Sequence, residues 1–258
     1  RSGAKGIEAD LSALGAATVR GAIELQGSPG AAVRGNVFAS LASAGANPAL
    51  VVCASTASMQ GGRMALSANV FGDVSGTTVV RLDGVDAADY SGLAVASAGD
   101  VNGDGFADIV IGARFASPAG DSFAGESFVV FGKATGFAAA VDLSTLDGSN
   151  GFRLDGIEIL DFSGVSVASA GDVNGDGFAD ILIGAYGGDS VGGADAGQTF
   201  VLFGQASGFA AALDLSTLDG VNGFRVDGID ASDESGFSVA SAGDFNGDGF
   251  DDILIGAR

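Results

Sequence analysis

A glycine-rich acidic segment occurs three times in this chain. GDVNGDGFADIVIGAR begins at Gly99, GDVNGDGFADILIGAY begins at Gly171, and GDFNGDGFDDILIGAR begins at Gly243. The segment therefore recurs every 72 residues. A fixed period of this length indicates repeated structural units, each of which buries its apolar faces against its neighbours. Any fold of the 258 residues must accommodate the same local structure three times.

Short apolar runs within each unit predict β-strands. Each run has four to eight residues, is rich in Val, Ile and Phe, and is bounded by Gly, Asp, Asn or Ser, as strands are. The run ILIGA does not alternate, so both of its faces should be buried, whereas SFVVFG and GFRLDG alternate as half-exposed strands do. Four strands and a long loop per unit predict an all-β fold. The expected architecture is a β-propeller of about 72-residue four-stranded blades, either partial or part of a larger propeller.

The repeat frame makes residues 1–258 a single β-propeller domain or a fragment of one. We expect an outer-strand region of a preceding blade, a degenerate blade without an acidic loop, two full blades and the first half of another. The corresponding ranges are 1–34, 35–90, 91–162, 163–234 and 235–258. In the degenerate blade, the loop shrinks to Ala46–Ala49 and loses its carboxylates. A half blade should leave an open sheet edge and an exposed apolar face.

Oxygen-bearing side chains occupy alternate positions of the acidic segment. Counted from its first Asp, the loop has Asp, Asn, Asp and Asp at positions 1, 3, 5 and 9, and the main-chain carbonyl of Phe at position 7. Gly at position 6 permits the sharp turn. Alternate positions of a tight loop converge, and such hard oxygens suit Ca²⁺ better than Mg²⁺, which demands a stricter octahedron. The predicted calcium ligands are Asp100, Asn102, Asp104, Phe106 and Asp108; Asp172, Asn174, Asp176, Phe178 and Asp180; and Asp244, Asn246, Asp248, Phe250 and Asp252.

Two other loop families and a metal-free turn are the alternatives for this segment. EF-hands and dockerins need a carboxylate at position 12 and a helix after the loop. Position 12 is Ile111, Ile183 or Ile255, inside a strand-like run, so the loop should close at position 9 and continue into a strand. A plain Asp/Asn/Gly turn remains possible, but three carboxylates within nine residues repel one another unless a cation lies between them. We therefore expect three Ca²⁺ ions with a structural role.

The segments DVNGDGFAD, IVIGAR and FVVFG together resemble the FG-GAP repeat of the integrin α-subunit propeller and its bacterial relatives. The resemblance is good over residues 91–258 and weak over 21–90. The usual Pro of the GAP element is replaced by Arg114, Tyr186 and Arg258. The resemblance implies that the loop joins the first two strands of a blade and holds Ca²⁺ on one face. It also implies that ligands or partner domains dock on the other face, usually of a seven-bladed propeller.

Composition excludes several classes of function. A formal charge of -21 with only 11 Lys and Arg disfavours nucleic acid and anionic membranes as partners. The absence of His removes the commonest general base, and no run of about 18 apolar residues predicts a membrane span. No signal peptide is visible at the N-terminus. We expect that the protein is not an enzyme.

Two sets of loops are candidates for binding. The carboxylate pairs in DAAD, EILD and DASDE recur in register, which favours a solvated repeat feature or a second weak cation site over a catalytic pair. Phe115–Gly125 and Tyr186–Gly197 differ from each other while the strands around them are nearly identical. Variable loops on a constant scaffold are where binding usually occurs.

These observations predict an extracellular or cell-surface protein. The main hypothesis is a calcium-stabilised propeller module that binds a protein or glycan ligand, for adhesion or recognition, on the face opposite the calcium loops. The alternative is a structural propeller subunit that self-associates in a filament, an oligomer or a larger chain. An accessory domain of a secreted enzyme is the third hypothesis.

Overall fold

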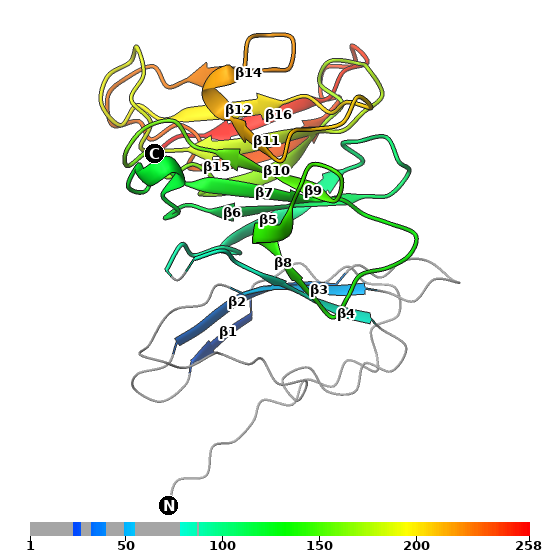
Figure 1. Cartoon of the computed structure of the whole chain (residues 1–258). Coiled ribbons are helices and arrows are strands. Elements are labelled where there is room, and N and C mark those ends of the chain that lie inside the picture. The colour runs from blue at the N-terminus through cyan, green and yellow to red at the C-terminus, as the bar shows by residue number, and fades with distance from the viewer. Residues whose placement is uncertain (1–22, 27–31, 40–48, 55–77, 87) are drawn as a thin grey trace, which may run out of the picture.

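The computed structural model describes residues 23–26, 32–39, 49–54, 78–86 and 88–258. The expected outer-strand region (1–34) and the shortened loop (46–49) lie largely outside these residues. In the described ranges the chain is all-β, with sixteen strands, short 3₁₀ turns and no α-helix. Figure 1 shows the sheets following one another from the N-terminal to the C-terminal end of the chain. The all-β prediction is confirmed.

Two sheets have the predicted four antiparallel strands in sequence order. The first sheet contains β5 (Ala94–Gly99), β6 (Asp108–Ala113), β7 (Glu126–Val130) and β9 (Gly151–Asp155). The second contains β10 (Ser166–Gly171), β11 (Asp180–Ala185), β12 (Gln198–Leu202) and β14 (Gly223–Asp227). A hairpin of β15 (Ser238–Gly243) and β16 (Asp252–Gly256) repeats the first two strands. These units are the four-stranded blades and the half blade that the repeat predicts.

The N-terminal sheet departs from this pattern. Its strands β1 (Ile23–Gln26), β2 (Ala32–Ala39) and β3 (Ala49–Ala54) are antiparallel neighbours. Strand β4 (Thr78–Asp83) then lies parallel to β3, whereas the outer strands β9 and β14 are antiparallel to their neighbours. This sheet therefore does not repeat the strand directions of the two complete blades.

Short strands that the sequence did not reveal tie each blade to the one before it. Strand β8 (Ala140–Asp142) pairs in parallel with β4, and β13 (Ala212–Asp214) pairs in parallel with β9. Each leads into a 3₁₀ turn, η3 (Leu143–Thr145) or η4 (Leu215–Thr217), whose first leucine is buried. Three residues are too few to show a periodicity, so only the tertiary structure reveals this link.

The two ends of the second strand in each blade define two faces of the molecule. The acidic loops precede β6, β11 and β16, and the β6–β7 and β11–β12 loops lie at the opposite ends of the same strands. We call the end that carries the acidic loops the loop face and the other end the opposite face.

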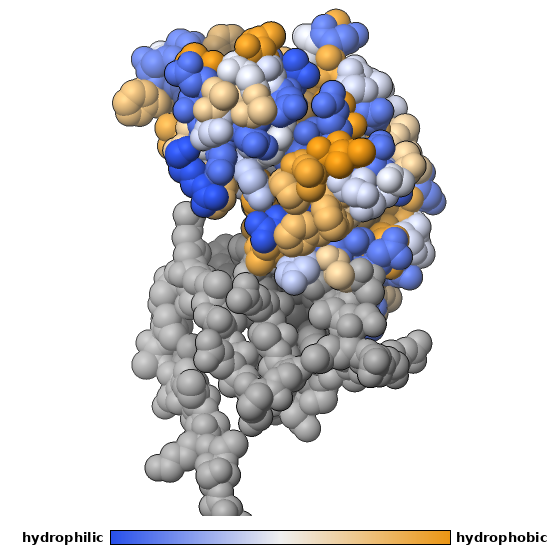
Figure 2. Space-filling view, turned by 90° about the vertical axis from the view of Figure 1, so that its left-hand side faces the viewer, coloured by the Kyte–Doolittle hydropathy of each residue, from blue (hydrophilic) through white to orange (hydrophobic). Residues whose placement is uncertain are grey.

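Figure 2 shows the side of the molecule on which the C-terminus lies in Figure 1. Apolar side chains gather there between polar ones.

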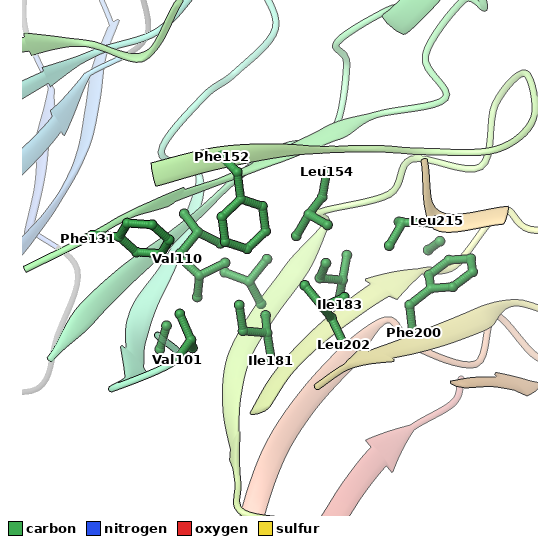
Figure 3. Packing of buried hydrophobic residues seen from close by; sticks show 14 residues of the cluster. Val101, Val110, Phe131, Phe152, Leu154, Ile181, Ile183, Phe200, Leu202 and Leu215 are labelled. Carbon is green, nitrogen blue, oxygen red and sulfur yellow. The ribbon is translucent and has the colours of Figure 1, made fainter. Parts of the chain in front are cut away.

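The main core lies between two blades. Side chains of Val110, Phe152 and Leu154 meet Ile181 and Ile183 of the next sheet (Figure 3). Glycine in the strand brings the blades this close. A Cβ on Gly112 would lie 2.0 Å from the Gly164 carbonyl oxygen, and a Cβ on Gly184 would lie 1.9 Å from that of Gly236. The glycine of the IGA run is therefore a packing requirement.

Leu182 and Leu254 occupy the same position of successive repeats and test this packing. Leu182 is fully buried, and it packs among Val239 and Ile253 of the next hairpin, whereas Leu254 is 58% exposed. Leu182→Ala should lower the free energy of unfolding by about 2–5 kcal/mol. Leu254→Ala should lower it by less than about 1 kcal/mol. Chemical denaturation of both variants checks this, and equal losses would show that blade packing does not distinguish the two positions.

Candidate metal centre

Each acidic loop joins the first two strands of a blade. Residues 100–108 connect β5 to β6, 172–180 connect β10 to β11, and 244–252 connect β15 to β16. The strand begins at the ninth residue in every case, so the prediction that the loop closes at position 9 and continues into a strand is confirmed. We call them the first, second and third acidic loops.

The position-1 aspartate organises the turn. In the first loop Asp100 Oδ1 accepts hydrogen bonds from the N–H groups of Gly103 (2.8 Å) and Asp104 (3.0 Å), and Oδ2 accepts one from Gly105 (2.9 Å). Asp172 and Asp244 repeat all three bonds in their own loops. Gly103 and Gly105 have φ of +74° and +88°, a region that glycine adopts without strain.

Positions 3 and 5 lie side by side on the exposed part of the loop. Asn102 Oδ1 accepts from the Asp104 N–H at 3.0 Å, and Asn102 Nδ2 donates to Asp104 Oδ2 at 3.1 Å. Asp104 Oδ1 accepts from the Phe106 N–H at 2.9 Å. The second loop has the same bonds through Asn174 and Asp176. The structure thus brings positions 1, 3 and 5 into one hydrogen-bonded turn.

In the first and second loops the position-9 aspartate is buried beneath that turn. The Asp108 carboxylate accepts hydrogen bonds from the N–H of Val101 (2.9 Å) and from the N–H of Gly132 (2.8 Å). Gly132 lies just beyond the C-terminal end of β7. The Asp180 carboxylate accepts the equivalent bonds from Val173 (2.9 Å) and Gly204 (2.9 Å). In the third loop Asp252 is only partly buried, and its carboxylate accepts the equivalent bond from the position-2 N–H of Phe245 (2.8 Å) and another from Asn246 Nδ2.

Burial disfavours the ionised form of the Asp108 and Asp180 carboxyl groups. The pKa of Asp108 and of Asp180 is raised to about 6, chiefly by desolvation and also by the other aspartates of each loop, although the main-chain N–H groups lower it. No Lys or Arg in the described residues forms an ion pair with either carboxylate. A cation in the loop would relieve this repulsion.

The loops fit a hard cation in donor chemistry, charge and burial. Carboxylate and amide oxygens are the ligands that Ca²⁺ prefers. Among the residues that the structure describes, however, no three Asp, Glu, Cys or His side chains converge as a metal site. The oxygens face main-chain N–H groups of the loop and of Gly132 instead, as the hydrogen bonds of Asp100 and Asp108 show. The ligand set of the sequence analysis therefore stays a prediction.

Sequence reasoning missed the glycine of the FG dipeptide as part of this site. Gly132 and Gly204 donate the N–H that holds the buried aspartate, and each approaches its loop closely. A Cβ on Gly132 would lie 2.5 Å from the Ala107 carbonyl oxygen and 2.7 Å from Phe106 Cβ. The constant distance of the dipeptide from the position-9 aspartate in both blades was the available signal.

The carboxylate pairs lie on the opposite face, in turns that join one blade to the next. There the Leu160 and Phe162 N–H groups donate to the Ser122 and Phe123 carbonyls at 3.0 and 3.1 Å. Asp161 is buried, and its carboxylate accepts from the Glu158 N–H at 2.9 Å. Of the two interpretations that the sequence favoured, a solvated repeat feature and a second weak cation site, the solvated one does not hold for Asp161, because its side chain is buried and closes its own turn.

Glu126, at the start of β7, is also buried close to the opposite face. Arg153 Nε lies 3.7 Å from its Oε1 but makes a closer pair with Asp155 at 2.5 Å. The pKa of Glu126 is raised from 4.5 to about 7, chiefly by desolvation; Arg153 lowers it, and Asp155, Asp89 and Asp86 raise it. Gln198 occupies the same position of the next blade, with a buried side chain.

The pKa of Glu126 predicts a pH dependence of stability. Because the folded state holds its proton more tightly than the unfolded state, the free energy of unfolding should fall as the pH rises from about 4.5 to about 7. Asp108, Asp161 and Asp180 also have raised pKa values and contribute to this fall. Glu126→Gln should therefore make the fall smaller, and it should be more stable than the parent at pH 8 by about 1–3 kcal/mol, with little difference at pH 4. Denaturation across this pH range checks it. The exposed Glu158→Gln is the control, and an unchanged profile in Glu126→Gln would contradict the prediction.

Comparison with known proteins identifies the repeats. The family model described as FG-GAP repeat matches residues 91–130, 163–202 and 235–258. Integrin alpha-IIb of Mus musculus is 31% identical over 182 residues, 69% of this chain and 16% of that protein. Integrin alpha-V of Gallus gallus is 29% identical over 185 residues (70% and 16%), and integrin alpha-PS5 of Drosophila melanogaster is 30% identical over 193 residues (72% and 17%).

The chain spans about a sixth of the length of these relatives. Each of the three matched stretches contains one acidic loop and the strands on either side of it. The three acidic loops and their strands are therefore FG-GAP repeats, in an all-β chain that is similar to part of the integrin α subunits.

Proposed function

We propose that this chain is a calcium-stabilised β-propeller module, secreted or displayed at the cell surface, that recognises a protein or glycan ligand in adhesion. The observation that carries the calcium part is the buried carboxylate of Asp108 and Asp180. Each lies among like charges with no cationic side chain paired to it in the described residues. Similarity to integrin α subunits supports a role in recognition rather than catalysis.

Calcium would be held by the side-chain oxygens at positions 1, 3, 5 and 9 and the position-7 carbonyl. Bound there, the ion supplies charge neutralisation. The chain's own residues do the rest: the position-1 aspartate shapes the turn, and the position-9 aspartate ties the loop to the end of the third strand. A site of modest affinity is filled where Ca²⁺ is millimolar, which supports an extracellular location. No helix of the described residues is long and apolar enough to cross a membrane.

Calcium should raise the melting temperature strongly. A ligand that binds only the folded state stabilises by mass action, about 2.7 kcal/mol per site at a hundred times its dissociation constant. Thermal unfolding with Ca²⁺ and with a chelator, together with equilibrium dialysis, should show three ions per chain. Asp104→Ala, Asp176→Ala and Asp248→Ala should each remove one ion.

Asp121→Ala is the matched control, because this exposed aspartate lies outside the acidic loops. It should leave the stoichiometry at three. Binding of no calcium, with equal melting temperatures in both conditions, would make the loops metal-free turns.

The opposite face supports the recognition part of the proposal. The β6–β7 and β11–β12 loops differ between blades. Phe123 of the β6–β7 loop and Tyr90 of the turn before β5 are 42% and 44% exposed. Both rings contact Phe115 edge-on, at 5.4 and 5.0 Å between centroids. Exposed aromatic side chains with an adjustable polar surround suit protein or glycan ligands.

A panel of glycans and matrix proteins tests this face. Calcium-dependent binding that Phe123→Ala and Tyr90→Ala weaken at least tenfold is expected. Val221→Ala, at an exposed apolar position just before β14 and outside the acidic loops, should leave the affinity unchanged. Absence of any calcium-dependent ligand would count against recognition.

The last hairpin favours a second candidate, self-association. Within the described residues β16 pairs only with β15, and Phe245 and Leu254 are 86% and 58% exposed. An open edge beside an apolar face binds another sheet readily, whether that sheet belongs to a second copy or to further residues of a longer chain. Light scattering separates the candidates: a monodisperse monomer contradicts self-association, and oligomers that Leu254→Glu dissociates would support it.

A further inference from the structure

Neighbouring acidic loops are in direct contact. The N–H of Ala179, at position 8 of the second loop, donates to the Asp100 carbonyl of the first at 3.0 Å, and Asp251 N–H donates to the Asp172 carbonyl at 3.1 Å. The position-7 rings reach the same neighbour. A Cβ on Gly103 would lie 2.3 Å from Phe178 Cε1, and one on Gly175 would lie 2.5 Å from Phe250 Cε1. The second loop therefore covers the first, and the third covers the second.

The two junctions differ in one side chain. Position 8 is Ala107, Ala179 and Asp251 in successive loops. Asp251 Oδ2 accepts a hydrogen bond from the Asp172 N–H at 2.8 Å, which alanine cannot do. The second loop therefore receives a carboxylate from the next blade, whereas the first does not.

The main chain around the carboxylate has the same shape at both junctions. Gly171 has φ +81°, and a Cβ there would lie 2.0 Å from Asp251 Oδ2; Gly99 has φ +79° and faces the Ala179 Cβ. The absence of a side chain before position 1 thus leaves room for an aspartate in both loops, although only the second has one.

Asp251 holds the residue that organises the second loop. It accepts from the N–H of Asp172 and donates to its carbonyl, so both main-chain groups of Asp172 are fixed by one residue of the next blade. The Asp172 side chain in turn accepts from Gly175, Asp176 and Gly177. Asp251 also brings one more negative charge to a loop that already carries three carboxylates.

We propose that Asp251 is a positioning residue of the second calcium loop, supplied by the following blade, and that it makes this loop bind Ca²⁺ more tightly than the first. The proposal rests on the calcium function proposed above. Fixing Asp172 reduces the ordering that binding requires, and the added charge attracts the cation. Because coupling between sites is reciprocal, Ca²⁺ in the second loop should also strengthen the contact with the third.

The two junctions provide matched variants. Asp251→Ala gives the third loop the position-8 residue of the other two, and Ala179→Asp transplants the carboxylate to the first junction. Calcium titration calorimetry uses the full chain with a single functional loop: Asp104→Ala with Asp248→Ala leaves the second, and Asp176→Ala with Asp248→Ala leaves the first. Asp251→Ala should weaken the second loop roughly three- to tenfold, and Ala179→Asp should strengthen the first by a similar factor.

Asp251→Asn separates charge from hydrogen bonding, since it keeps an acceptor for the Asp172 N–H. Its affinity should lie between those of the parent and Asp251→Ala, and the difference from the parent should shrink in high salt. Amide exchange without calcium is an independent readout. The Asp172 amide should exchange faster in Asp251→Ala than in the parent, while the Asp100 amide should not change.

The outcomes distinguish this proposal from the calcium function. If the parent binds Ca²⁺ but Asp251→Ala leaves the second loop's affinity and the Asp172 exchange rate unchanged, the proposal is overturned and the calcium function stands. If Asp251→Ala weakens the first and second loops equally, its effect is general and the proposal fails. If no loop of the parent binds Ca²⁺, both fall.

Discussion

One buried carboxylate per blade connects three strands. Asp108 is the first residue of β6. Its carboxylate accepts hydrogen bonds from the N–H of Val101, just beyond β5, and from the N–H of Gly132, just beyond β7. Asp180 makes the equivalent bonds in the next blade. The acidic turn above it and the sheet below it are therefore held by the same side chain. Because burying this charge is costly, the blade is most stable when something neutralises it.

Close approach of main chains is the second constraint on the structure. Glycines in the second strand face the main chain of the next blade at distances that no Cβ would permit, as Gly112 and Gly184 show. This proximity brings Val110 and Phe152 against Ile181 and Ile183. The same repeat geometry places each acidic loop beneath the following one. Packing of the core and contact between the loops thus have a common origin.

Much of the fold was predictable because the signals are local. Strands β6, β11 and β16 lie where short apolar runs follow the loop, and positions 1, 3 and 5 lie together in one tight turn. Strands β8 and β13 were not predicted, because three residues show no pattern and their partners belong to another blade. The burial of Asp161 was not predicted. Its turn is hydrogen-bonded to a loop that lies about forty residues earlier in the sequence, and local patterns do not reveal such a contact.

The sequence by itself determined the repeat, the strand-forming runs and the oxygen-rich loops, because these depend on the spacing and chemistry of neighbouring residues. Only the tertiary structure decided which residues act on a loop from outside it. Gly132 reaches Asp108 from the end of another strand, and Asp251 reaches Asp172 from another blade. Such contacts join residues that are far apart in the sequence, and they form only when sheets stack closely enough for one main chain to touch the next.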